Sequence, residues 1–286
     1  MHGFLAVDKP AGMTSRDAVD RAAAWLPRGT RLGHTGTLDP LATGVLVLAV
    51  GAGTRLAEYV QALRKTYVAG IRLGAGSDTD DAEGTVTPVE GCVAPDRSAI
   101  ALALAGFVGA IEQVPPAFSA AHVDGQRAYD LARKGKEVEL APRKVHIERI
   151  ELLRYEYPRL DIEVRCSKGT YIRSLARDLG ERLGCGGYIE SLRRTMVGPF
   201  DVTSAVGLDA ERAESLGRLQ PLETGLTGLP RIILAPADAM GFCQGRKKEL
   251  TEAPCGIAAV FGQDGMLLGV GEVSGRTLAP VKVIQV

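Results

Sequence analysis

The segment that most constrains the fold is residues 45–50, which read Val-Leu-Val-Leu-Ala-Val. No polar residue alternates with the apolar ones, so a strand formed here has no face suited to water. The run therefore predicts a buried, central strand of a sheet. Further strands are expected over residues 4–7, 66–73, 84–89, 145–155 and 160–166, with the last two paired.

Helices are expected between these strands. Thr14 or Ser15 can cap a helix that runs through residue 24, and Thr170 is expected to cap one that ends at Leu183 and is closed by Gly184. Shorter helical patterns cover residues 56–63, 95–107 and 126–133. Because helices and strands do not alternate regularly, the pattern predicts an α+β fold and excludes a doubly wound sheet.

The residue pattern of the chain changes near its C-terminus. Residues 220–231 contain Pro221, Gly225, Gly228 and Pro230 and are typical of a linker. Beyond them, residues 257–261 and 266–273 flank Gln-Asp-Gly as in a hairpin, and 279–286 is another strand candidate. We therefore expect two domains, 1–228 and a small β-rich domain at 229–286.

The overall charge gives no hint of the partner. Lys plus Arg and Asp plus Glu number 34 each, and 45% of the residues are apolar, as in ordinary soluble globular proteins. The distribution is segregated, however: residues 78–90 hold five acids and no base, whereas 127–149 hold seven bases and four acids. Such local patches can bind phosphates even when the total charge is zero, although each alone is equally consistent with a solvated face.

Several classes of protein are excluded or disfavoured. Five widely spaced cysteines without a Cys-x-x-Cys motif are typical of a reduced, cytoplasmic protein. The scattered histidines predict no metal site, and the acidic residues 78–84 do not match a calcium-binding loop. The N-terminus lacks a signal segment, and uncharged runs such as 98–111 fall short of the about 20 residues that span a bilayer.

The most unusual segment is Gly-His-Thr-Gly-Thr-Leu-Asp-Pro-Leu-Ala-Thr-Gly at residues 33–44. It leads directly into the buried strand, and Pro40 keeps Asp39 away from helical geometry. Gly36 and Gly44 allow close backbone approach or positive φ. The segment thus presents one carboxylate from a stiff loop at a strand edge, although an isolated Asp-Pro would be no more than a turn.

This twelve-residue segment closely resembles the catalytic motif of the TruB family of tRNA pseudouridine-55 synthases. Other segments resemble the motifs of that family in the same order: 8–15, 65–67, 78–84, 113–120 and 167–173. The resemblance covers essentially the whole chain. It implies a mixed, largely antiparallel central sheet flanked by helices, followed by a PUA-like RNA-binding domain.

The resemblance also implies a role for each motif residue. Asp39 would be the nucleophile or electrostatic partner, Arg173 its cationic partner, and Tyr67 the aromatic side chain that stacks on the target base. His34 would fill or brace the space that the extracted base leaves. Read without the family, Arg173 is a surface cation, Tyr67 a half-buried strand aromatic, and His34 a loop residue bonded within its own turn.

The substrate implied by the resemblance is tRNA, bound through its T-arm, with no cofactor, no metal, no protein partner and a monomeric enzyme. A basic segment at about 124–146 would close over the RNA, and His122 stands where the family usually has Lys. The candidate RNA contacts are His34, Lys9, Lys65, Arg127, Arg133, Lys134, Lys136, Arg143, Lys144, Lys168 and Arg177.

Three alternatives remain open at this level. A non-catalytic RNA-binding factor on the same scaffold would be expected to lack Asp39, Tyr67 or Arg173, all of which are present. A guide-RNA-dependent relative that modifies rRNA usually carries extended tails. A carboxylate-based glycosidase would need a second acid at the site, and the motif supplies only one.

Overall fold

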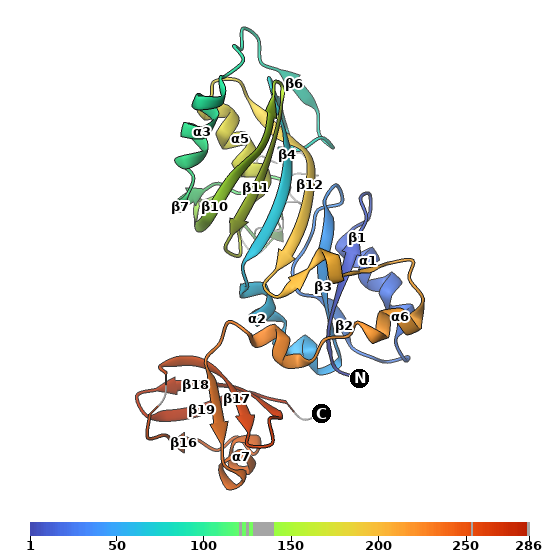
Figure 1. Ribbon diagram of the computed structural model, residues 1–286, viewed down its shortest axis with the longest axis vertical. Helices are drawn as coiled ribbons and strands as arrows, with labels where there is room; N and C mark the ends of the chain where they lie inside the picture. The colour runs from blue at the N-terminus through green and yellow to red at the C-terminus, as the bar shows by residue number, and fades with distance from the viewer. Residues whose placement is uncertain (120–121, 124–125, 128–139, 253, 285–286) are drawn as a thin grey trace.

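A computed structural model of the chain describes residues 1–119, 122–123, 126–127, 140–252 and 254–284. Its centre is a ten-stranded sheet in the order β14-β1-β3-β12-β4-β11-β10-β7, with β2 beside β3 and β13 beside β12 (Figure 1). The strands are β1 (Gly3–Lys9), β2 (Leu32–His34), β3 (Thr43–Val50), β4 (Lys65–Leu73), β7 (Gly109–Gln113), β10 (Arg143–Glu156), β11 (Arg159–Cys166), β12 (Gly187–Val197), β13 (Phe200–Asp201) and β14 (Val206–Gly207).

The central strand is the one that the apolar run predicts. Every residue of β3 after Thr43 is buried, and β3 lies between β1, its antiparallel neighbour, and β12, its parallel neighbour. Apart from the pairs β1–β14 and β3–β12, the neighbouring strands of this sheet are antiparallel. The predicted α+β fold with a mixed, largely antiparallel sheet is therefore confirmed.

Helices cover one face of the long half of this sheet. α3 (Arg97–Ala105) packs against β10, and α5 (Ile172–Arg182) packs against β12 and β4 on the same side (Figure 1). Along β11, buried residues alternate with more exposed ones, so the opposite face is open to solvent. We call these the helix-covered face and the open face of the sheet.

The helix termini mostly follow the sequence signals. α1 (Ser15–Ala22) begins at Thr14 with a capping box closed by Asp17, and Asp96 caps α3. The prediction that Thr170 caps α5 is wrong: the N-cap is Tyr171, and the Thr170 hydroxyl donates to the Ser167 carbonyl at 3.1 Å. The side chain of Gln113 from β7 holds the backbone N–H and C=O of Tyr171 instead, a long-range contact that no local pattern reveals.

Other local predictions need correction too. The helix expected at 126–133 is wrong at its start, where β9 (Gln126–Arg127) pairs with β8 (His122–Val123); residues 128–133 lie outside the described residues. The strand expected at 84–89 shortens to β6 (Val86–Pro88), which pairs with β5 (Ala75–Ser77). The helix expected at 56–63 is η2 (Gly51–Leu56) followed by α2 (Ala57–Ala62).

The C-terminal residues form a separate five-stranded sheet with one helix. Its order is β15-β17-β18-β19-β16, and β17 and β18 form the predicted hairpin (Figure 1). The elements are β15 (Arg231–Leu234), α7 (Pro236–Cys243), β16 (Lys248–Glu249), β17 (Gly256–Gly262), β18 (Leu267–Ser274) and β19 (Thr277–Val283). Among the described residues, no helix is long and apolar enough to cross a membrane.

The stretch expected to be a linker is firmly packed. It contains η4 (Leu222–Leu226), whose Leu222 and Leu226 are buried against Phe4 of the main sheet. The same apolar cluster includes Phe261 and Val270 of the C-terminal sheet. The short helices α6 (Arg212–Gly217), η1 (Ala23–Trp25) and η3 (Val202–Ser204) complete the described elements.

Candidate active site

The loop at residues 33–44 is held by backbone and side-chain contacts from the N-terminal elements. The Ser15 hydroxyl donates to the carbonyl of Leu38 at 3.0 Å and accepts from its N–H at 2.8 Å. The N–H of Gly12 donates to the carbonyl of Pro40 at 2.9 Å. Asp39 lies between these anchored residues with 36% of its side chain exposed, so a fixed backbone presents an accessible carboxylate.

Lys9 supports the same loop from inside. Its side chain is buried, and its ammonium donates to the carbonyls of Pro10, Met13 and Pro40 at 2.9, 2.6 and 3.3 Å. Burial lowers the pKa of Lys9 to about 8, and the negative charge of Asp39 opposes that shift. The expected RNA contact of Lys9 is not compatible with this arrangement, because its ammonium is enclosed and fully engaged.

Arg173 reaches the loop from the first turn of α5. Its Nε lies 2.9 Å from Oδ2 of Asp39, and only 6% of its side chain is exposed. This contact is an ion pair, because Nε does not meet hydrogen-bond geometry. The pairing that the motifs imply between Asp39 and Arg173 is thus present in the fold.

Three further contacts fix the Arg173 guanidinium. Nη1 lies 3.2 Å from Oδ2 of Asp81 and donates to the carbonyl of Thr79, while Nη2 donates to the carbonyl of Phe118. Asp81 is itself buried and accepts from the hydroxyl of Thr79. Asp81 was not among the site residues predicted from the sequence, although it lies in the acidic motif 78–84, and this position was the available signal.

Tyr67 lies on β4 and faces the helix-covered side. Its ring is half-buried and packs against the core that includes α5. Burial raises the pKa of Tyr67, the Asp39 carboxylate adds to that effect, and the guanidinium of Arg194 opposes it. The phenol is therefore protonated at neutral pH and lies within electrostatic range of Asp39.

His34 stands at the end of β2, where the loop begins. Burial lowers its pKa, and the guanidinium groups of Arg194 and Arg16 lower it further. The imidazole is consequently neutral at neutral pH. Its Nδ1 is buried and has no hydrogen-bond partner in the part of the chain that the structure describes, so a bound molecule could supply one.

The remaining basic candidates differ in accessibility. The Lys65 ammonium is buried and donates to the carbonyls of Gln61 and Leu63 at the C-terminal end of α2. This enclosed position excludes a phosphate contact, and burial lowers the pKa of Lys65 to about 8. Arg177 is paired with Asp80 at 2.9 Å and Asp178 at 2.8 Å. Arg143, Lys144 and Lys168 are exposed, and Arg127 lies in β9. Arg133, Lys134 and Lys136 lie outside the described residues.

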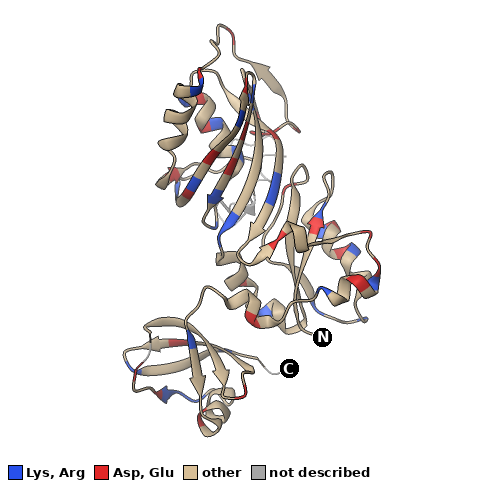
Figure 2. Cartoon of the chain, viewed as in Figure 1, with Lys and Arg blue, Asp and Glu red and all other residues tan. Residues whose placement is uncertain are grey.

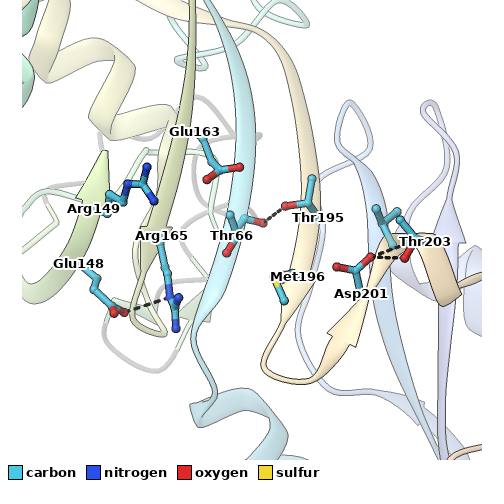
Figure 3. A pocket seen from close by; sticks show the side chains of 10 residues that line it. Thr66, Glu148, Arg149, Glu163, Arg165, Thr195, Met196, Asp201 and Thr203 are labelled. Carbon is cyan, nitrogen blue, oxygen red and sulfur yellow. Dashed lines mark hydrogen bonds and ion pairs between the residues drawn. The ribbon is translucent and has the colours of Figure 1, made fainter. Parts of the chain in front are cut away.

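A cavity of about 610 Å³ lies on the open face of the sheet (Figure 3). Thr66, Thr195 and Arg165 line it, whereas Tyr67, the neighbour of Thr66 in β4, faces the other side. The side chains around it have both signs of charge, with Glu148 and Arg165 paired at 3.2 Å. The cavity and the Asp39 site are therefore separate. No cluster of three potential metal ligands occurs among the residues that the structure describes.

Two models of known protein families match the chain. One, described as TruB family pseudouridylate synthase (N terminal domain), matches residues 25–172. The other, described as tRNA pseudouridylate synthase B C-terminal domain, matches residues 173–227. The fold, the site and these matches define a pseudouridylate synthase.

Full-length relatives narrow this class. The tRNA pseudouridine synthase B of Azoarcus sp. (strain BH72) is 42% identical over 286 residues, which cover 99% of this chain and 94% of that protein. The tRNA pseudouridine synthase B of Aromatoleum aromaticum (strain EbN1) is 46% identical over 290 residues, covering 99% and 92%. The chain therefore belongs to the TruB family, as its motifs predict.

Solved structures support the fold. A chain from a Cbf5-Nop10-Gar1 complex aligns with a TM-score of 0.76 at 23% identity, covering 98% of this chain and 84% of that chain. A chain from an H/ACA RNP bound to a substrate RNA containing 2'-deoxyuridine aligns with a TM-score of 0.73 at 22% identity, covering 99% and 85%. At these identities the likeness concerns the fold alone.

Proposed function

We propose that Asp39, Arg173 and Tyr67 carry out the isomerisation of uridine 55 in the T-loop of tRNA. The observation that carries this proposal is the ion pair of 2.9 Å between Asp39 and Arg173, which joins a loop after β2 to the first turn of α5. A carboxylate that is partly exposed and held by a buried cation is the group that this reaction needs. Membership of the TruB family supplies the reaction and the tRNA substrate.

The reaction replaces one bond of the ribose with another. The N1–C1′ bond of uridine breaks, the uracil turns while it is bound, and a C5–C1′ bond forms; C5 loses its proton and N1 gains one. No atom is added or removed overall, so the reaction consumes no redox partner or energy source, and we propose that it uses no cofactor. The Asp39 carboxylate, held 2.9 Å from the guanidinium of Arg173, can act as the nucleophile or stabilise the electron-poor ribose.

Tyr67 and His34 complete the pocket for the base. The raised pKa of Tyr67 keeps its phenol protonated, so that its ring can stack on the uracil and its hydroxyl can donate. The buried Nδ1 of His34 lacks a partner in the described part of the chain and would meet a polar group of the flipped nucleotide. Extrusion of the base costs roughly a few kcal/mol, which phosphate contacts help to offset.

The RNA-contact surface is the exposed basic rim of this site. Arg143, Lys144 and Lys168 are accessible there and can meet phosphates. The segment 124–146 is proposed to close over the RNA with Arg127, Arg133, Lys134 and Lys136. Residues 229–286 would be a PUA-like RNA-binding domain following a catalytic domain at 1–228. We further propose a cytoplasmic enzyme that works as a monomer.

The test is Asp39→Ala assayed on an unmodified tRNA transcript in the presence of a chelator, with mass-spectrometric mapping of pseudouridine. The variant should bind tRNA with wild-type affinity and form no pseudouridine. Glu156→Ala is the matched control, because that carboxylate is 73% exposed at the far end of β10. Near-wild-type isomerisation by Asp39→Ala would refute the assignment, and tRNA binding without turnover by the wild type would favour a non-catalytic RNA-binding factor.

A further inference from the structure

Arg194 is a buried cation that the sequence analysis did not assign to the site. It lies on β12 in register with Gly44 of β3 on one side and Tyr67 of β4 on the other. Only 3% of the residue is exposed. Its backbone therefore lies between the end of the Asp39 loop and the active-site tyrosine itself.

The guanidinium of Arg194 donates to backbone carbonyls of the loop and of β3 just after it. Nε donates to the carbonyl of Val45 at 2.7 Å, Nη1 to that of Thr37 at 3.3 Å, and Nη2 to that of Gly36 at 3.2 Å. These acceptors lie on both sides of Asp39 in the sequence. A planar fork that bonds both flanks of a loop fixes its shape in a way that a single point charge cannot.

Arg194 has no carboxylate within ion-pair distance among the residues that the structure describes. In this respect it differs from Arg173, which pairs with Asp39 and Asp81, and from its neighbour Arg193, which pairs with Asp8 at 2.7 Å. Burying a cation without a counter-ion is costly. The compensation comes from the hydrogen bonds to the carbonyls of Val45, Thr37 and Gly36, so the burial of Arg194 is tied to the shape of the Asp39 loop.

The charge of Arg194 reaches the groups of the site. It lowers the pKa of His34, of Lys9 and of Lys65, and it opposes the rise in the pKa of Tyr67. The same positive charge would stabilise a base that leaves the ribose as an anion. A fixed, buried dipole or charge costs no reorganisation when the reaction occurs.

We propose that Arg194 is a positioning residue of the reaction, which fixes the loop that carries Asp39 and brings a buried positive charge to it. The inference rests on the proposed function, since it concerns the same site. Arg194 itself does not contact the RNA, because its side chain is enclosed. The effect is therefore on the rate of the chemical step and not on the affinity for tRNA.

The test compares Arg194→Lys, Arg194→Gln and the wild type in single-turnover reactions with tRNA, alongside tRNA affinity and thermal unfolding. Arg72→Gln is the control, because that arginine lies on β4 with 45% of its side chain exposed and pairs with Glu190 on the open face. We expect both Arg194 variants to bind tRNA within about twofold of the wild type and to lose at least about tenfold in rate, since small displacements of reacting groups cost up to about a hundredfold. Arg194→Lys keeps the charge and should be the more stable variant, yet it should not regain the rate.

Each outcome decides the proposal. A rate within about threefold of the wild type for Arg194→Lys, a matching loss of affinity, or failure of both variants to fold would overturn it. If only Arg194→Gln fails to fold, the rate of Arg194→Lys decides. An inactive wild-type protein would refute the proposed function itself, whereas an active wild type with fully active Arg194 variants would refute only the role of Arg194.

Discussion

The helix-covered face and the open face of the long sheet carry the same types of charged residue, but these are buried on the first face and exposed on the second. On the open face, basic and acidic residues are interleaved along β10 and β11 (Figure 2). Charged residues of this face pair across or along the strands, as Arg165 does with Glu148 at 3.2 Å and Arg72 with Glu190 at 3.4 Å. Between 36% and 55% of these four side chains is exposed. On the helix-covered face, Arg173 and Asp81 pair at 3.2 Å with 6% and 5% exposed.

The difference teaches that burial, and not the type of residue, gives a charge its chemical effect. An exposed pair is screened by water and salt and is worth about 0–1 kcal/mol. A buried pair loses its hydration, so removal of one partner leaves a costly charge and its neighbours shift their pKa values. Four changes, from the largest expected effect to the smallest, test whether the two faces differ in this way.

Arg173→Lys should have the largest effect. A single ammonium cannot hold Asp39, Asp81 and two carbonyls together, so the rate of pseudouridine formation should fall by about a thousandfold, equivalent to about 4 kcal/mol. Single-turnover kinetics and tRNA affinity, measured side by side, check this. An equal loss of rate and affinity would mean that Arg173 contacts phosphate, and the contrast between the faces would lose its main support.

Gly44→Ala should destabilise the protein by about 3 kcal/mol or more. Gly44 has φ +98°, and a Cβ there would lie 2.1 Å from the carbonyl oxygen of Arg194, inside the paired strands β3 and β12. Gly36→Ala, in the same motif, is the matched control, because nothing lies within 4 Å of a Cβ placed there and its φ is not positive. The close approach or positive φ predicted for both glycines is therefore found at Gly44 alone of the two. Urea unfolding distinguishes them, and equal midpoints would show that the close approach does not matter.

Asp80→Asn should reveal a pH-dependent cost of burial. Burial raises the pKa of Asp80 from 3.8 to about 6, although Arg177 and Arg173 oppose the shift. Between these pH values the native state binds the proton more tightly than the unfolded chain, so this carboxyl contributes stability at low pH and loses it as the pH rises through about 6. Asn stays neutral and also tolerates the positive φ of 62° at this position.

The stability of Asp80→Asn relative to the wild type should therefore increase between pH 4 and pH 7, on the order of 1 kcal/mol. Urea unfolding at several pH values measures the difference. Glu163→Gln, the same change of carboxyl to amide on the open face, is the control. A flat or falling difference for Asp80→Asn would mean that the Arg177 pair outweighs burial.

The smallest effect is expected for the open-face pair Glu148–Arg165. Both side chains are about half exposed, so a double-mutant cycle with Glu148→Gln and Arg165→Gln should give a coupling of about 0.3 kcal/mol that vanishes at high salt. A coupling above about 1 kcal/mol would indicate that the cavity on the open face shields the pair. In that case the ion pairs of the open face would not be uniformly weaker than those of the helix-covered face.

The sequence was a good guide to the elements and to the chemical motifs. The apolar run 45–50 predicts the central strand, Thr14 predicts a helix start, and the pattern over 95–107 predicts α3, because these signals act within a few residues. Prediction from the sequence failed where a residue far along the chain supplies the hydrogen-bond partner. Gln113 takes the role expected of Thr170, and the buried contacts of Lys9 and Lys65 were not visible in their motifs.

What the sequence by itself determined is the family, the α+β class and the identity of Asp39, Tyr67 and Arg173 as candidates, since ordered motifs are a property of the chain. Only the tertiary structure decided which charges are enclosed. It places Arg173 against Asp39 and Asp81, assigns Lys9 to the support of the loop, and encloses Arg194 among the carbonyls of that loop. The physical reason is that burial and ion pairing depend on distances between distant segments, which no local pattern of residues specifies.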